Sequence, residues 1–519
     1  MKRYLFRDLQ VPLARKDELP ELLARALRVK PSELFDLQVE RFSLDSRKRG
    51  RPHFSYTLSF ACQRALHESS GAVPVAETPA AKRDELENSV PVSKTVHIVG
   101  AGPAGLWASL TLLRKGFKVT LHEQGKPVQE RFRDIQKFTL DRRFNAHSNV
   151  LFGEGGAGAF SDGKLNTRTR SFFSQQVLRD MVALGMPREI MTFAKPHLGT
   201  DRLSKMLEEL RRQILSLGGA FEFGSVFEDL ELQNGEVVAA KFSGKWERTN
   251  ALVLATGHSA RGVYELLAAR GVALEAKAFA VGVRVEHPQR LINERQLGRG
   301  VDLKLTGSAE YALTAKTLCG ASAAYSFCMC PGGVLVPCVS ENETLATNGM
   351  SYSARDGEFA NGAIVVPVKA SAKLFGGLEL QRELEAKAFL MGGRTYSAPA
   401  QTVKAFLNTS LDKALPKTSY QCGLVPANLH ELLPRDIAAS LAEGFENFDR
   451  KIPGFIAEGL MVAPETRTSS PLRITRNPDT LEAVATRGLF VLGEGAGYAG
   501  GIVTSAADGV KFAFRARPA

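Results

Sequence analysis

The sequence has no apolar run as long as the roughly 18 residues that a membrane-spanning helix needs. Its first residues, MKRYLFRDLQ, carry charges where a secretory signal peptide would have its apolar region. Cysteine is scarce as well, with six in 519 residues, so a disulfide framework is not indicated. We therefore expect a cytoplasmic protein that does not span a membrane.

The composition is that of a folded protein with more than one domain. Hydrophobic residues make up 44% of the chain and charged residues 24%, which argues against a disordered chain, and 519 residues suggest two or three domains. The net charge of +12 is compatible with a nucleic-acid or membrane-surface partner. The basic residues are scattered, however, and the densest cluster, 47–51, is short. We favour a basic surface that helps to collect an anionic cofactor or substrate.

Residues 1–70 are predicted to form a small α+β domain. Apolar residues have helical spacing in 18–29, whereas 35–44 and 53–61 alternate as strands do. A polar stretch rich in alanine, glutamate and proline follows, so we expect residues 71–93 to be a linker.

Residues 95–124 are typical of a β-α-β unit with a dinucleotide site in its first turn. Gly100 permits the tight turn, Gly102 lets the backbone approach a pyrophosphate, and Gly105 lets the helix pack closely on the sheet. The phosphates would then meet N–H groups at the helix N-terminus. Glu123 ends the second strand, where its carboxylate can accept both hydroxyls of an adenosine ribose. NAD and FAD both fit this pattern.

A second G-x-G-x-x-G match, formed by Gly153, Gly155 and Gly158, has no clear helix after it. We therefore do not interpret it as a second nucleotide fold. The glycines could wrap closely around a flat ring; a merely flexible loop is the alternative. Polar contacts to such a ring are available from Ser161, Asp162 and Lys164, which flank Gly163.

The chain then returns to the predicted sheet. We expect a helix at 200–217 and strands at 220–223, 226–232, 237–242 and 251–255. The last strand is apolar and ends in Thr256 and Gly257. Residues 275–455 differ, because many short β-like runs are interrupted by helices at 379–390 and 435–447, which indicates an inserted substrate domain.

A third G-x-G-x-x-G match, formed by Gly495, Gly497 and Gly500 near the end of the chain, favours one of the two cofactors. A buried strand at 489–492 leads into Gly493 and Glu494, and a helix is expected from about residue 502. Backbone N–H groups and one acid would thus lie beside the middle of an extended cofactor. NAD needs no such second contact from the far end of a chain, whereas the pyrophosphate and ribityl chain of FAD do.

At this point the sequence resembles the glutathione-reductase-like FAD oxidoreductases and, more narrowly, the uncharacterised FAD-dependent dehydrogenase family. The stretches that carry the narrower resemblance are FGEGGAGAFSDGKL (152–165), HLGTDRL (197–203), ATGHSARG (255–262), YSFCMCPGG (325–333), APETRTSSP (463–471) and GEGAGYAGGI (493–502). The resemblance implies an α/β fold: a Rossmann-like FAD-binding domain of glutathione-reductase type (94–274 and 456–519), an inserted β-rich α+β substrate domain (275–455) and the small N-terminal domain.

The resemblance also implies noncovalent FAD and assigns its contacts. The pyrophosphate would be held by Gly100, Gly102, Pro103, Ala104 and Gly105. The adenosine would lie against Glu123, Gln124 and the backbone of Val226. The rest of the cofactor would meet Gly158, Ser161, Gly163, Lys164, Thr256, Gly257, Glu494, Gly495, Gly500, Gly501 and Ile502. Many relatives in the broad superfamily carry Asp where this chain has Glu494, whose longer reach leaves its hydrogen-bond partner open.

The sequence does not identify the acid/base group. The catalytic candidates are His258, Cys330 and Arg467, and Arg473 could likewise clamp a substrate carboxylate. Each has a structural alternative: helix-start packing for the histidine, a small buried apolar residue for the cysteine, and pairing with buried acids or carbonyls for the arginines. We expect no metal site, because Cys319, Cys328, Cys330 and Cys338 match no usual zinc or iron–sulfur spacing.

The function expected from these observations is that of an FAD-dependent oxidoreductase acting on a small organic substrate. Electrons could come from NAD(P)H binding transiently, since no second complete β-α-β unit is evident. One alternative is a fumarate-reductase-like reductase of activated double bonds. Another is an RNA-associated flavoprotein, supported only by the basic turn at 47–51.

Overall fold

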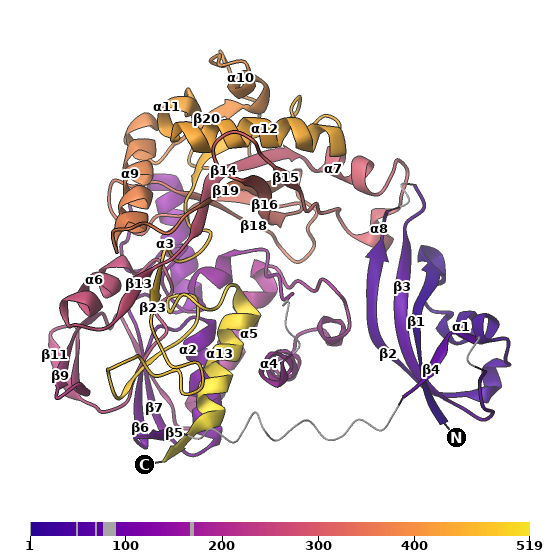
Figure 1. The fold of residues 1–519 in the computed structure, drawn as a ribbon, viewed down its shortest axis with the longest axis horizontal. Helices are drawn as coiled ribbons and strands as arrows, with labels where there is room; N and C mark the ends of the chain where they lie inside the picture. Colours follow the sequence, from indigo (N-terminus) through magenta and orange to yellow (C-terminus); the bar gives the residue numbers. More distant parts are fainter. Residues whose placement is uncertain (1, 48–49, 68–69, 76–89, 167–170, 519) are drawn as a thin grey trace.

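The computed structural model describes residues 2–47, 50–67, 70–75, 90–166 and 171–518. Figure 1 shows three parts: an N-terminal unit, a parallel sheet with helices, and a larger mixed sheet. The mixed sheet is inserted in the sequence of the second part. In the described part of the chain no helix is both long and apolar enough to cross a membrane.

The N-terminal unit is a four-stranded sheet in the order β2-β3-β1-β4 with one helix against it. Its elements are β1 (Lys2–Pro12), α1 (Leu19–Leu27), β2 (Leu34–Asp45), β3 (His53–Cys62) and β4 (Ala72–Pro74). The predicted helix and the two predicted strands are confirmed. The sequence analysis missed β1, because the charged residues of KRYLFRDL hide its alternation and a register shift between Phe6 and Leu9 interrupts its period.

The two ends of the predicted linker are strands. β4 pairs with β1, and β5 (Val90–Val92) pairs in parallel with β25 (Ala516–Pro518) at the end of the chain. Residues 76–89 of that segment lie outside the described residues. The N-terminal unit also contacts the other parts: the rings of Phe42 and Phe193 lie 4.9 Å apart, and the Gly50 amide donates to the Leu297 carbonyl at 2.9 Å.

The second part is a five-stranded sheet in the order β24-β12-β6-β7-β8, and all of its neighbouring strands are parallel. The strands are β6 (Thr95–Val99), β7 (Lys118–Glu123), β8 (Ala220–Phe223), β12 (Leu252–Leu254) and β24 (Leu489–Val491). This arrangement confirms the β-α-β unit and the return of two distant segments to one sheet. β24 comes from nearly the far end of the chain and lies beside β12.

Helices cover one face of this sheet and a meander covers the other. The helices are α2 (Pro103–Arg114), α4 (Phe172–Ala183), α5 (Thr200–Ser216) and α13 (Ile502–Arg515), which share one hydrophobic core with Val96 and Ile98. α2 and α13 lie side by side, because Gly509 lets the two backbones approach (Figure 1). The other face carries the antiparallel strands β9 (Phe227–Gln233), β10 (Glu236–Phe242) and β11 (Lys245–Arg248), together with α6 (Arg261–Ala269).

The inserted part is a seven-stranded sheet in the order β15-β16-β19-β14-β22-β20-β21. Its strands are β14 (Phe279–Pro288), β15 (Thr314–Lys316), β16 (Ala323–Cys330), β19 (Phe359–Val368), β20 (Ala398–Thr402), β21 (Leu424–Pro426) and β22 (Leu460–Glu465). The central strand β14 is buried for nine of its ten residues, as its apolar sequence predicts. The sheet includes β22, which lies beyond the expected domain boundary at residue 455.

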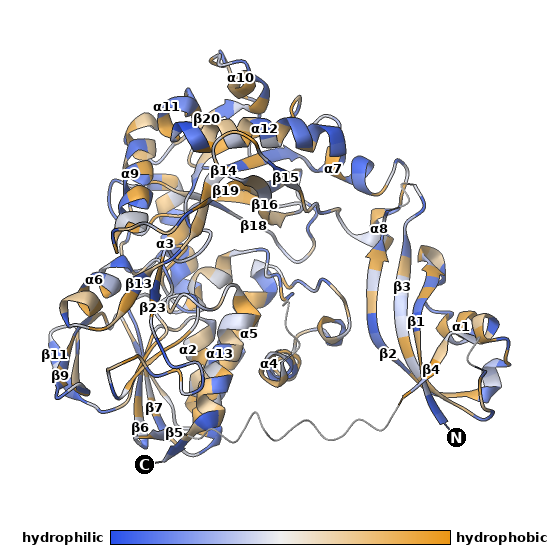
Figure 2. Cartoon of the chain, in the orientation of Figure 1, coloured by the Kyte–Doolittle hydropathy of each residue, from blue (hydrophilic) through white to orange (hydrophobic). Residues whose placement is uncertain are grey.

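Helices flank this sheet on its outer side in Figure 1. They are α7 (Gln289–Gln296), α9 (Gly376–Met391), α10 (Val403–Leu407), α11 (Leu429–Leu432) and α12 (Arg435–Lys451). The short helix α8 (Leu303–Thr306) lies beside the N-terminal unit instead (Figure 1). Figure 2 shows hydrophobic colour in β14 and β19 and hydrophilic colour on α7, as expected for a sheet buried beneath amphipathic helices. The remaining elements are α3 (Val128–Asp141), β13 (Leu274–Ala276), β17 (Val334–Pro337), β18 (Thr347–Met350) and β23 (Leu472–Ile474).

Candidate cofactor site

The first glycine motif forms the turn between β6 and α2. Gly100 has a φ of +102°, and a Cβ built on it would lie 2.5 Å from the carbonyl oxygen of Ala255 at the end of β12. A Cβ on Gly105 would collide with the carbonyl oxygen of Gly100. Gly102 differs: its φ is −78°, and the nearest atom to an added Cβ is the Cα of Gly156, at 4.0 Å. Two glycines therefore serve packing, and the third faces open space.

The second glycine motif lies against the first. The Gly155 amide donates to the carbonyl of Ala101 at 2.8 Å, and Gly156 follows with a positive φ. A Cβ on Gly158 would lie 3.1 Å from Cγ1 of Ile502, the first residue of α13, and 3.8 Å from Cγ of Pro103. The second motif thus bridges the N-termini of α2 and α13.

The third motif completes this arrangement. A Cβ on Gly495 would lie 2.8 Å from the carbonyl oxygen of Gly257, and one on Gly493 would lie 3.0 Å from Cβ of Ala104. In contrast, Cβ atoms on Gly500 and Gly501 would meet no atom within 4 Å. The last motif is therefore packed on the first at one end and open at the N-terminus of α13.

Glu123 is buried at the end of β7 and holds the loops around it. Its Oε2 accepts from the Ala101 amide at 2.8 Å, and its Oε1 accepts from the amides of Gly125 and Gly153 at 2.9 and 3.0 Å. A carboxylate has about four acceptor positions. Oε2 therefore keeps capacity for a ribose hydroxyl while the carboxylate links the first two glycine motifs.

The other adenosine residues have partners of their own. The Val226 amide donates to Oγ of Ser243 at 2.9 Å, and its carbonyl accepts from the Ser243 amide at the same distance. The side-chain oxygen of Gln124 lies 3.5 Å from Nδ1 of His147. Val226 and Ser243 thus lie opposite each other just outside the paired ends of β9 and β10, and both backbone polar groups of Val226 have partners.

Glu494 reaches the N-terminus of α13. Its Oε1 accepts from the Gly501 amide, and its Oε2 lies 3.6 Å from Nε2 of His258. An acid at this position is favoured by the helix dipole. Burial raises the pKa of the Glu494 carboxyl, the Gly501 amide opposes this, and the nearby Cys328 raises it further. The partner that the sequence left open is therefore the first free amide of α13.

His258 lies beside this carboxylate. The imidazole is buried, and its Nδ1 has no hydrogen-bond partner in the described part of the chain. Burial lowers the pKa of His258 to about 3, and the charges of Arg467 and Arg261 lower it further. At neutral pH the ring is uncharged and accepts protons poorly, so its position favours a hydrogen-bonding role.

Ser161, Gly163 and Lys164 belong to one tight segment. Oγ of Ser161 donates to the Gly158 carbonyl at 2.8 Å and accepts from the Gly163 amide at 3.1 Å. The Lys164 ammonium contacts Asp162 at 2.6 Å and donates to the carbonyl of Met329 in β16. This lysine therefore connects the second glycine motif to the inserted sheet.

Asp162 is the anchor of that connection. Arg355 donates to both of its carboxylate oxygens, to Oδ1 at 2.9 Å. Burial alone would raise the pKa of Asp162, but the charges of Lys164 and Arg355 lower it to about 2. Asp162 is thus ionised and paired between two cations.

The two cysteines of β16 differ in exposure. Cys330 is fully buried, and its thiol lies 3.4 Å from the Cys328 carbonyl, whereas Cys328 is half-buried. Cys328 has a φ of +41° at a register shift in the strand, which breaks the alternation that would place both thiols alike. A hydrogen bond with Cys330 lowers the pKa of the Cys328 thiol, burial opposes this, and Arg284 and Lys164 lower it further.

Arg284 lies under Cys328 in the inserted sheet. It is fully buried and donates to Glu465 at 2.7 Å and to the Cys328 carbonyl at 2.8 Å. Burial raises the pKa of Glu465 to about 6 although Arg284 opposes the shift. The sequence analysis missed this pair; a charged residue inside the apolar run AVGVRVEH was the available signal.

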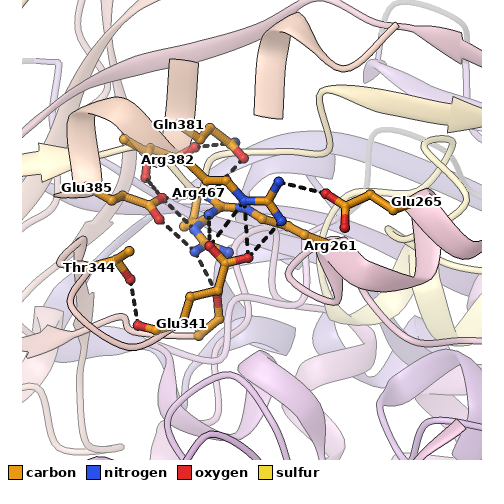
Figure 3. Close-up of polar contacts among 10 residues, drawn as sticks. Arg261, Glu265, Glu341, Thr344, Gln381, Arg382, Glu385 and Arg467 are labelled. Atoms are coloured by element: carbon orange, nitrogen blue, oxygen red, sulfur yellow. Dashed lines mark hydrogen bonds and ion pairs between the residues drawn. The ribbon is translucent and has the colours of Figure 1, made fainter. Parts of the chain in front are cut away.

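Arg467 is part of a buried ionic network that Figure 3 shows. Its guanidinium donates to Oε1 and Oε2 of Glu385 at 2.8 and 2.9 Å and to Oγ of Ser340 at 2.7 Å. Arg261, at the start of α6, donates to the same Glu385 at 2.8 Å and to Glu341 at 3.0 Å. The network therefore joins α6 to α9. Both carboxylate oxygens of Glu385 accept hydrogen bonds from Arg467, as the structural alternative for this arginine predicts.

Arg473, the other arginine candidate, lies elsewhere. Its Nη1 is 2.6 Å from Oε1 of Glu275, and its guanidinium carbon is 4.8 Å from the centre of the Tyr498 ring. In the N-terminal unit, Arg47 of the basic turn pairs with Asp45 at 2.5 Å, and Lys48 and Arg49 lie outside the described residues.

Taken together, these features fit an extended dinucleotide such as FAD. Two helix N-termini, those of α2 and α13, meet at the second glycine motif. Gly102, Gly257, Gly500 and Gly501 border open space, and Glu123 keeps an acceptor position for a ribose. Cys328 is close enough to Glu494 to raise the pKa of its carboxyl, and Lys164 contacts the carbonyl of Met329, the residue after Cys328.

Comparison with known proteins places the chain in a family. Residues 278–468 match the family described as "FAD-dependent protein, C-terminal domain-like". A protein of Clostridium beijerinckii, described as an uncharacterized protein, is 40% identical over 514 residues, which cover 95% of each chain.

Solved structures are more distant. L-proline dehydrogenase from P. horikoshii is 10% identical, with a TM-score of 0.36, and the match covers 82% of this chain and 93% of that one. Glycine oxidase from Geobacillus kaustophilus is 12% identical, with a TM-score of 0.35 and coverage of 82% and 95%. Similarity at this level supports no inference about activity. The identity along nearly the whole length and the matched C-terminal domain show that the chain belongs to the same family as the C. beijerinckii protein, a family of FAD-dependent proteins.

Proposed function

We propose that the protein is an FAD-dependent oxidoreductase that acts on a small organic substrate. The observation that carries this proposal is the meeting of three glycine motifs, from 95–124, 150–166 and 493–502, around the N-termini of α2 and α13. A single β-α-β unit would serve NAD equally well. The second helix terminus and its acid, Glu494, favour a cofactor that extends past its pyrophosphate.

The cofactor would be bound noncovalently in a domain arrangement of glutathione-reductase type. The amides at the start of α2 would hold the pyrophosphate, with Glu123 and Val226 on the adenosine side. Gly500, Gly501 and Ile502 would lie along the ribityl chain and the ring edge. The bound flavin would supply hydride or electron transfer, and the protein positions the substrate and controls protons.

The substrate would bind between the parallel sheet and the inserted sheet. Lys164 and Cys328 are the partly exposed polar groups that the second glycine motif and β16 bring together there. Lys164 would orient an anionic or carbonyl group of a substrate. Of the catalytic candidates, Cys330 is buried behind Cys328 and Arg467 is engaged by Glu385, which leaves His258 and Cys328 nearest to the proposed ring position.

Anaerobic reduction of the purified protein tests this proposal. We expect NADH or NADPH to bleach the flavin absorption, and one compound from a panel of oxidised substrates, including fumarate and other activated double bonds, to restore it. A matched Lys164→Met variant, compared with the unaltered protein after both are saturated with FAD, should reoxidise more slowly with that compound. A flavin that is reduced by neither donor and also by no reduced member of the panel contradicts the proposed oxidoreductase function.

A further inference from the structure

Two buried histidines and a glutamate meet on the meander face of the parallel sheet. His97 lies in β6, His122 in the neighbouring β7, and Glu247 in the meander strand β11. Nδ1 of His97 is 3.1 Å from Nε2 of His122 and 3.4 Å from Oε2 of Glu247. One donor atom from each residue lies within 4.8 Å of the other two.

These separations are those of neighbouring ligands around one small cation. Ligand atoms about 2.0–2.1 Å from a tetrahedral metal lie about 3.3–3.4 Å from one another. The two distances at His97 fall close to this value. A hydrogen bond between the imidazoles would account for the nitrogen pair alone, because it uses one proton, on Nδ1 of His97 or on Nε2 of His122. It gives no reason for a carboxylate oxygen at the same nitrogen.

The surroundings fix the orientation of the rings. Nδ1 of His122 lies 2.9 Å from Oγ of Ser225, so its other nitrogen, Nε2, is the one that faces His97. The His122 ring is also stacked on Phe242 of the meander, with 3.7 Å between ring centres and 4° between planes. A hydrogen bond to the second nitrogen of a ligating histidine is a usual feature of metal sites.

The site is closed on one side and open on the other. His97 and His122 are 7% and 1% exposed, whereas the Glu247 side chain is 41% exposed. A cation and one water molecule can therefore enter past the carboxylate while the imidazoles remain in place.

We propose that His97, His122 and Glu247 bind a divalent transition-metal cation of the zinc type, with water as the fourth ligand. Two imidazoles and one carboxylate suit Zn²⁺ and Co²⁺, whereas Mg²⁺ and Ca²⁺ prefer an all-oxygen shell. The cation would join the meander strand β11 to the parallel strands β6 and β7. Binding of this cation does not depend on the proposed oxidoreductase function.

The test is calorimetric titration of the chelator-treated full-length protein with ZnCl₂. We expect one Zn²⁺ per chain and an increase in melting temperature. CoCl₂ should give the strong visible absorption of a four-coordinate site, at wavelengths beyond the flavin band. Mg²⁺ should give neither effect.

Variants separate this site from adventitious binding. Glu247→Gln should weaken Zn²⁺ binding by about tenfold or more, and His97→Gln should abolish it. Glu231→Gln, which removes an exposed carboxylate of the same meander, should bind as the unaltered protein does. Because Glu247 is partly exposed, its variant should fold, which circular dichroism verifies. Absence of 1:1 binding to the unaltered protein, or equal affinity in all of these variants, overturns the proposal.

Discussion

Gly495 lies directly against Gly257: a Cβ on Gly495 would stand 2.8 Å from the Gly257 carbonyl oxygen. This contact joins the turn after β12 to the turn after β24, two neighbouring strands of the parallel sheet. A side chain on Gly495 would push the last glycine motif away from the turn after β12, whereas a Cβ on Gly257 would meet no atom within 4 Å. The proposed cofactor site therefore depends on backbone packing between segments that are remote in sequence.

Two alanine substitutions in the first motif should affect different properties: one the stability of the fold and the other the affinity for FAD. Gly105→Ala places a methyl group against the Gly100 carbonyl, so it should destabilise the fold by about 1–3 kcal/mol. Gly102→Ala adds a methyl in open space at an ordinary φ, so stability should change by less than about 0.5 kcal/mol. That methyl points to the proposed pyrophosphate position, so FAD affinity should fall about tenfold or more, equivalent to about 1.4 kcal/mol.

Urea unfolding of the flavin-free variants and fluorescence titration with FAD measure the two effects. If the Gly102→Ala protein binds FAD as tightly as the unaltered protein does, the pyrophosphate does not bind at this turn.

Glu385 should be among the most sensitive residues of the fold. It is fully buried between Arg261 and Arg467, so Glu385→Gln removes the carboxylate that Arg467 pairs with and leaves Arg261 with Glu341 (Figure 3). Breaking a buried ion pair in this way costs about 3–5 kcal/mol. Glu265→Gln removes a partly exposed carboxylate from Arg382 and should cost less than about 1 kcal/mol. Urea unfolding at pH 7 compares the two variants.

The same carboxylate predicts a pH dependence. Burial raises the pKa of Glu385, but Arg467 and Arg261 outweigh it and hold the pKa below its usual value. The unfolded chain therefore binds a proton more readily, and the stabilisation is complete above the unfolded pKa of about 4.3 and is lost as the pH falls below it. The stability difference between the unaltered protein and Glu385→Gln should accordingly shrink in acid. A difference that stays constant from pH 7 to pH 3 would show that Glu385 is not held as a carboxylate.

Cys328 should react as a thiolate at neutral pH. Cys330, Arg284 and Lys164 lower the pKa of its thiol, so alkylation by iodoacetamide should already have reached its plateau rate near pH 7. Lys164→Met should shift the rate profile towards higher pH. Peptide mass spectrometry follows Cys328 and the exposed Cys319 in the same sample. If the Cys328 rate rises tenfold per pH unit between pH 6 and pH 8, the thiol is not ionised in that range.

The sequence predicts the helices and strands of the proposed site better than it predicts which side chains pair with one another. Glycine motifs and apolar periodicity are local signals, so the β-α-β unit, the meander and the return of 251–255 and 489–492 to one sheet could be predicted. The pairing of Arg261 and Arg467 with Glu385 could not, because it joins residues from three distant segments. An arginine in sequence looks equally suited to a substrate carboxylate and to a buried glutamate.

The cysteines show where periodicity misleads. Alternation in a regular strand predicts that Cys328 and Cys330 point to the same side. The positive φ of Cys328 interrupts the strand, so that Cys330 is buried and Cys328 is half-buried. A local irregularity of this kind leaves no signal in composition. Because of it, Cys328 is a better catalytic candidate than Cys330, the candidate from the sequence.

The most direct measurement of the central claim is the nucleotide content of the purified protein. Heat denaturation followed by chromatography of the supernatant should give one FAD per chain after reconstitution, and a smaller fraction from Gly102→Ala at the same FAD concentration. A correctly folded protein that neither carries FAD nor takes it up from solution would contradict the site described above.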